Sequence, residues 1–112
     1  MPRPAATDDT FRAIADRTRR DILELLGSPG QELPVTEMAV RLGVSVPLLS
    51  RHLAVLRTAG MVAERRDGRR RLYRLNPEPL KELYDWAVLF QGFWTERITQ
   101  LRNYLGQQAP RL

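Results

Sequence analysis

The chain has 112 residues, of which 18 are basic and 13 acidic, and it contains one histidine and no cysteine. A chain of this length folds as one small domain, with no second lobe to enclose an active site. Without cysteine it has no disulfide, no thiolate nucleophile and no sulfur-ligated metal, so we expect no enzyme, no metal site and no cofactor.

The ends of the chain and its apolar segments give no indication of a membrane. The first ten residues lack the apolar core of a signal peptide, and the longest strictly apolar run is Trp86 to Phe90. We therefore expect a cytoplasmic protein with no membrane contact. Residues 1–6 are predicted to form a flexible N-terminal arm, and residues 7–112 a single domain.

Two helices are predicted in the first quarter of the chain. Thr7 is expected to cap the first helix, which has three residues on its buried side: Phe11, Ile14 and Ala15. Asp16 is expected to cap the second helix, over residues 17–26. Arg19 and Arg20 on this second helix are interpreted as structural residues, because acidic residues lie nearby in the sequence.

A tandem pair of short helices is predicted over residues 36–59. Thr36 is expected to cap the first, over residues 37–42, and Ser45 to cap the second. Gly43 can adopt the left-handed conformation that ends a helix. Apolar residues of both helices and the turn converge on one core: Met38, Ala39, Leu42, Val44, Leu49, Leu53 and Leu56. This spacing is typical of a helix-turn-helix.

A wing is predicted over residues 61–75. Two strands, residues 61–66 and 70–75, flank the turn pair Asp67-Gly68, which tight hairpins favour. A hairpin directly behind the second helix of a helix-turn-helix is a wing, and the tip of this one is rich in arginine.

The positive charge of the chain gathers in the second helix and the wing. Residues 51–74 contain two acidic residues and eight arginines, which give a local net charge of +6, whereas the rest of the chain carries −1. The eight are Arg51, Arg57, Arg65, Arg66, Arg69, Arg70, Arg71 and Arg74. Such clustering predicts one surface that binds a polyanion.

A long last helix is predicted over residues 79–105. It carries an apolar stripe and six of the eight aromatic residues, more apolar surface than a small helical core can cover. We expect a second copy of the chain to cover it, the alternative being a helix that folds wholly onto its own domain. The expected dimerisation residues are Phe11, Trp86, Phe90, Phe93, Trp94, Ile98 and Leu101.

Three segments of the sequence resemble the ArsR-type (ArsR/SmtB) winged helix-turn-helix repressors: FRAIADRTRRDILELL, TEMAVRLGVSVPLLSRHLAVLRTAGMV and GRRRLYRL. The resemblance covers about residues 10–105. It implies a mainly α fold with a small β-hairpin, made of about five helices and a two-stranded wing. It also implies a homodimer, paired through its first and last helices, that binds a palindromic operator in double-stranded DNA and represses transcription.

The chain departs from this family at two places. Metal-sensing members carry a cysteine pair near Thr36 or Asp and His ligands on the last helix, and this chain has neither the cysteines nor a histidine there. It therefore resembles the metal-independent branch. At Val46 the family usually has a polar residue, often Gln, so a hydrogen bond to a base is lost at that position.

The candidate DNA contacts lie on the second helix of the pair and at the wing tip: Ser45, Val46, Pro47, Ser50, Arg51, His52, Arg66, Arg69 and Arg70. Arg51 can bind guanine bidentately or grip a phosphate, and Ser50 suits either contact. For His52 two positions stay open, a phosphate contact or an interior or edge position. Arg69 and Arg70 are expected to meet the sugar-phosphate backbone or to enter the minor groove.

A second function is compatible with the same pattern. Winged helices also serve as protein-interaction or RNA-binding modules, and the broad aromatic face of the last helix agrees with such a role. The sequence leaves the effector open as well: an apolar small molecule, a protein partner, or regulation by the protein's own concentration.

Overall fold

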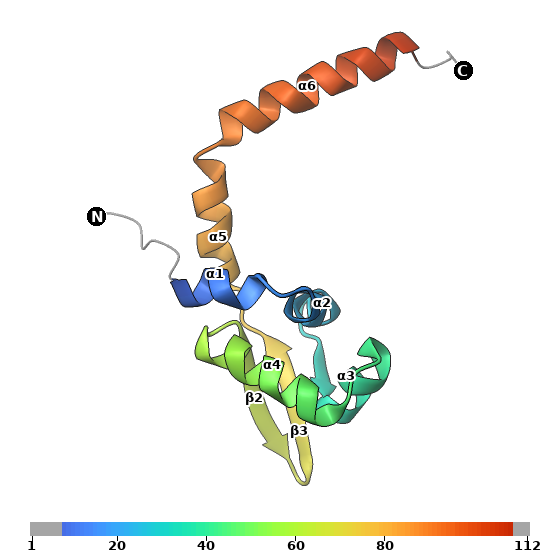
Figure 1. Ribbon diagram of the computed structural model, residues 1–112, viewed down its shortest axis with the longest axis vertical. Coiled ribbons are helices and arrows are strands. Elements are labelled where there is room, and N and C mark those ends of the chain that lie inside the picture. Colours follow the sequence, from blue (N-terminus) through green and yellow to red (C-terminus); the bar gives the residue numbers. More distant parts are fainter. Residues whose placement is uncertain (1–7, 109–112) are drawn as a thin grey trace.

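The computed structural model describes residues 8–108 (Figure 1). The elements follow one another as α1 (Asp8–Ile14), α2 (Arg17–Leu25), β1 (Glu32–Pro34), α3 (Val35–Leu42), α4 (Val46–Thr58), β2 (Val62–Asp67), β3 (Arg70–Leu75), α5 (Glu78–Val88) and α6 (Gln91–Gln108). The expected class, a mainly α winged helix-turn-helix, is confirmed. The predicted arm, and Thr7 as the first cap, lie outside the described residues.

The tandem helices are α3 and α4, and they meet at the predicted turn. Gly43 ends α3 in the left-handed region, with φ of 67°, and the Ser45 side chain caps α4. All seven apolar residues predicted for this core are buried or packed against it. The start of α3 differs from the prediction: the helix begins at Val35 behind Pro34, without a side-chain cap, and Thr36 lies in its first turn.

The wing hairpin belongs to a larger sheet than the sequence indicated. β2 and β3 form the predicted hairpin, and β1 joins β3 on its other side, so that the antiparallel order is β1-β3-β2. Leu33 of β1 lies opposite Tyr73 of β3, and both are buried. At the tip Asp67 pairs with Arg70, which makes Gly68 and Arg69 the turn.

The buried side of α1 differs from the prediction. Thr10 and Ala13 are buried, whereas Phe11 is 37% exposed and Ala15 lies at the surface beyond the end of the helix. Phe11 instead packs edge-on against Trp86 of α5, with ring centroids 5.5 Å apart. The helix is only seven residues long, so it gave too short a pattern to fix its buried face.

The predicted single last helix is wrong, because the structure has two helices. The amides of Leu89 and Phe90 bond three residues back, to Trp86 and Ala87, and this tight turn ends α5 before α6 begins. α6 then points away from the rest of the molecule (Figure 1), and all its described side chains are exposed. The alternative of a helix folded wholly onto its own domain is therefore also wrong for α6.

Candidate nucleic-acid interface

The N-terminal half of α4 presents an exposed face on a well-anchored helix. Leu49 is fully buried and fixes the rotation of α4, while the Ser45 hydroxyl oxygen accepts a hydrogen bond from the Leu48 amide at 3.3 Å. Val46, Pro47 and Arg51 are exposed, and Ser50 is half-buried. Capping and burial therefore hold α4 in a fixed orientation, which determines the direction in which its exposed residues face.

His52 lies at the junction of α1 and α2 and not on the exposed face. Its side chain is 16% exposed, and its Nδ1 lies 4.0 Å from Oδ1 of Asp16 and 3.3 Å from Nη1 of Arg19. Arg19 also donates to the carbonyl oxygens of Arg12 and Ala13 at the end of α1, at 2.9 and 2.8 Å. This is the interior or edge position that the sequence left open, and Arg19 has the structural role that was predicted.

The carboxylate of Asp16 caps the start of α2 at this junction. The Asp16 carboxylate accepts a hydrogen bond from the Arg19 amide at 3.2 Å, and this bond, together with nearby His52, lowers the pKa of Asp16. Arg20 donates to the carbonyl oxygen of Ile14 at 2.8 Å. Both arginines therefore bind backbone carbonyls at the end of α1, a role that local charge spacing did not reveal.

Three of the eight clustered arginines are held by carboxylates. Arg65 of β2 binds Glu32 of β1 with both Nε and Nη2, at distances of 2.6–3.0 Å. Arg57 of α4 donates to Glu64 at 2.7 Å, and Arg71 lies 3.7 Å from the same carboxylate. Among the described residues, five of the clustered arginines have no ion pair within 4 Å: Arg51, Arg66, Arg69, Arg70 and Arg74.

Glu64 joins α4 to the wing. The Tyr73 hydroxyl donates to Glu64 Oε2 at 2.8 Å, and this bond is the main reason why the pKa of Glu64 lies below its usual value. Burial, with that same contact, raises the pKa of Tyr73. Because Glu64 also binds Arg57 of α4, it fixes α4 relative to β2 and β3. One sign of this role is visible in the sequence, an acidic residue inside a basic run.

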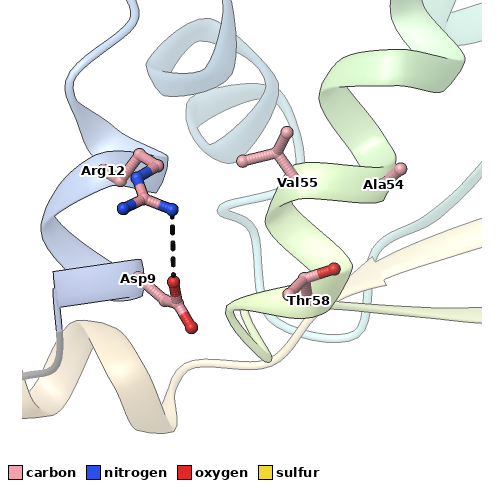
Figure 2. A pocket seen from close by; sticks show the side chains of 5 residues that line it. All are labelled: Asp9, Arg12, Ala54, Val55 and Thr58. Carbon is pink, nitrogen blue, oxygen red and sulfur yellow. Dashed lines mark ion pairs between the residues drawn. The ribbon is translucent and has the colours of Figure 1, made fainter.

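A hollow of about 260 Å³ separates α1 from the C-terminal half of α4 (Figure 2). Ala54, Val55 and Thr58 line it from α4, and Asp9 and Arg12 from α1, with Asp9 Oδ1 3.6 Å from Arg12 Nη1. Because Asp9 and Arg12 pair with each other, the hollow adds no net positive charge for a phosphate backbone at this end of α4. The surface best suited to a polyanion is therefore the N-terminal half of α4 together with the wing.

A second surface, formed by α5, α6 and Phe11, is apolar. Its exposed large side chains are Phe11, Tyr84, Trp86, Leu89, Phe90, Phe93, Trp94, Ile98, Leu101, Tyr104 and Leu105, which include every predicted dimerisation residue. Trp86 contacts both Phe11 and Phe90 edge-on, at 5.5 and 5.4 Å between ring centroids. So many exposed large apolar side chains on neighbouring elements are typical of a binding interface.

Neither a metal cluster nor a membrane span is found in the described part of the chain. Residues 8–108 bring no three His, Asp or Glu side chains together in a way that could hold a metal ion. None of the helices in that range is by itself long and apolar enough to cross a membrane. Within these residues, only α3 and α4 taken together have the length and apolar composition of a span, and these two helices are bent by 108° relative to each other.

Comparisons with known proteins identify the family. Residues 16–64 match the family described as "Bacterial regulatory protein, arsR family". Over 92 residues the chain is 42% identical to "HTH-type transcriptional regulator Rv2034" of Mycobacterium tuberculosis, a match that spans 82% of this chain and 81% of that protein. The chain belongs to the ArsR family.

Other ArsR-type proteins give the same result. The chain is 34% identical to "Transcriptional repressor SdpR" of Bacillus subtilis, over 74% of this chain and 90% of that protein. A solution structure from Mycobacterium bovis, titled as a homodimeric winged helix-turn-helix DNA-binding domain and a possible ArsR-family transcriptional regulator, aligns with a TM-score of 0.61 and 28% identity. It covers 80% of this chain and 81% of its own.

Membership of the ArsR family decides between the functions that the sequence left open. The protein is a DNA-binding transcriptional regulator with a winged helix-turn-helix, and not an enzyme. Within that fold, α4 is the recognition helix and the β2–β3 hairpin is the wing.

Proposed function

We propose that this ArsR-family protein is a homodimeric repressor that occludes a promoter by binding a palindromic operator. The observation that carries the proposal is the exposed face of α4 beside a wing whose tip holds Arg66, Arg69 and Arg70, three arginines that have no ion pair with any residue of the range 8–108. Its relative SdpR is named a transcriptional repressor. Such a regulator acts where the chromosome lies, which in a bacterium is the cytoplasm.

The proposed DNA contacts divide into reading and positioning contacts. Ser50 and Arg51 read base edges from the recognition helix in the major groove, together with the helix start at Val46 and Pro47. Ser45 brings the amides of the first turn of α4 toward a phosphate. The wing arginines bind the sugar-phosphate backbone or enter the minor groove. His52 supports α4 from behind, since its ring faces Asp16 and Arg19.

The proposed dimer forms through α1, α5 and α6. Their exposed aromatic side chains offer an interface that a second copy can bury, and the related Mycobacterium bovis domain is titled a homodimer. At about 25 cal/mol per Å², burial of several hundred Å² on each side suffices for a stable dimer. Two-fold symmetry then places the recognition helices in major grooves about one turn, roughly 34 Å, apart.

The signal that releases the repressor is proposed to involve no thiolate–metal site. The chain has no cysteine, and its one histidine is engaged at the α1–α2 junction. An apolar small molecule or a protein partner at the aromatic surface remains compatible with the geometry. A hollow of about 240 Å³ lies there, lined by Tyr84, Ala87, Val88, Gln91 and Trp94.

Two measurements test the proposal together. A gel-shift titration compares the DNA upstream of the protein's own gene with random duplex, and sedimentation equilibrium gives the oligomeric state. The proposal predicts a preferred duplex and a dimer that Trp94→Glu converts to a folded monomer with weakened DNA binding. Equal affinity for random duplex would contradict sequence-specific repression, and a wild-type monomer would contradict the dimeric mechanism.

A further inference from the structure

Exposed carbon atoms dominate the start of the recognition helix. α4 opens with Val46 and Pro47, both exposed, and the next residue, Leu48, is 42% exposed. Within the first residues of α4, 46–51, only Ser50 and Arg51 have side-chain hydrogen-bonding groups, and only Arg51 has a bidentate fork. This face is therefore poorly equipped to recognise most bases by hydrogen bonds.

Val46 is only partly covered by the protein's own fold. It is 38% exposed and stands outside the core cluster, whereas its neighbours Val44 and Leu49 pack against or belong to that cluster. An apolar side chain in this position gains free energy if a partner covers it. In the proposed complex the partner surface is the floor of the major groove.

The major groove offers one apolar group, the C5-methyl of thymine. We infer that Val46, assisted by Pro47, recognises thymine methyl groups, so that each operator half-site combines contacted thymines with the guanine or phosphate bound by Arg51. The inference rests on the proposed operator binding and adds to it the chemistry by which the operator is chosen.

The test removes the methyl groups without changing any hydrogen bond. The preferred duplex is first selected from random DNA by the wild-type protein. Each thymine is then replaced in turn by deoxyuridine, which lacks only the methyl group, and affinity is measured by fluorescence anisotropy. Burial of one methyl contributes about 0.8 kcal/mol, so the expected loss is about fourfold per contacted thymine. Symmetric replacement in both half-sites gives about fifteenfold.

A variant assigns the effect to one side chain. In Val46→Ala the loss caused by deoxyuridine shrinks at one position of each half-site, because that methyl has lost its partner. The matched control is Val40→Ala, since Val40 is a valine of α3 that is 82% exposed, and here the loss stays at its wild-type size. Both substituted positions are exposed, so both variants are expected to fold, and circular dichroism checks this.

The outcomes separate this inference from the proposed function. A protein that selects no sequence at all refutes both. A protein that selects an operator but tolerates deoxyuridine at every position refutes the methyl contact and leaves operator binding intact. A deoxyuridine loss that Val46→Ala does not reduce refutes the assignment to Val46.

Discussion

Removal of the two arginines at the turn of the wing is expected to weaken the salt dependence of DNA binding. Arg69 and Arg70 are exposed and have no ion pair within the described residues. Each phosphate that a protein neutralises adds about −0.9 to the slope of log affinity against log salt. In Arg69→Ala with Arg70→Ala a dimer loses four such cations, so the slope becomes shallower by up to about 3.6.

This change has a measurable consequence for affinity. Between 50 and 200 mM salt, a slope difference of about 3.6 corresponds to a change of about 10²-fold in the affinity ratio of wild type and variant. The variant therefore binds much more weakly than wild type at low salt, and the two approach each other at high salt. The choice of operator stays the same, because backbone contacts carry no direct sequence information.

The assay is a fluorescence anisotropy titration over that salt range, with two controls. Lys81→Ala removes the same kind of charge from α5, where Lys81 is paired with Asp85 at 3.2 Å. Deletion of the pair Arg65 and Glu32, by Arg65→Ala with Glu32→Ala, leaves the net charge unchanged. Neither control is expected to change the slope by more than a few tenths. If the wing-tip variant keeps the wild-type slope, or if Lys81→Ala lowers it equally, the reasoning from unpaired arginines is refuted.

Three further predictions concern single residues. Arg51→Ala should cost about 1–3 kcal/mol of operator binding and relax the preference at one base pair per half-site, measured by competition with single-base variants of the operator. Ser45→Ala should lower the free energy of unfolding by about 1 kcal/mol in a urea titration, because the α4 cap is lost, while Ser45→Asp retains it. The pKa of Glu64 lies below its usual 4.5, chiefly through the Tyr73 hydroxyl, so its contribution to stability is present above about pH 4.5 and is lost as pH falls through the lower folded value. The stability difference between wild type and Glu64→Gln should therefore shrink between pH 7 and pH 3, and a constant difference would contradict the assigned cause.

The sequence predicted the helix-turn-helix well because its determinants are local. A capping serine, a glycine able to adopt positive φ, and apolar residues at helical spacing all lie within residues 36–59. The break between α5 and α6 has no such determinant. Leu89 and Phe90 at the break are themselves apolar, so the stripe continues through it and periodicity alone predicts one helix.

The charge pattern shows a different limit. Counting residues gave a basic patch of +6, but a count cannot tell which arginine is paired. Glu32 is 33 positions away from Arg65 in the sequence and becomes its partner only through the sheet, since β1 and β2 flank β3. β1 is only three residues long, too short for its alternation to be recognised, so neither the strand nor this ion pair could be predicted from the pattern.

The two surfaces of the protein are physically connected, which bears on how a bound effector could release DNA. Trp86, at the aromatic surface, contacts Phe11 of α1. The carbonyl groups at the end of α1 are held by Arg19, and Arg19 contacts His52 on the recognition helix. An effector shifts an equilibrium only by its differential affinity for two states. Because α1 is short and contacts both α4 and α5, an effector that separates Phe11 from Trp86 acts on the segment that supports the back of α4. The seven-residue helix α1 therefore links the aromatic surface to the recognition helix, and any coupling between the two surfaces is expected to pass through it.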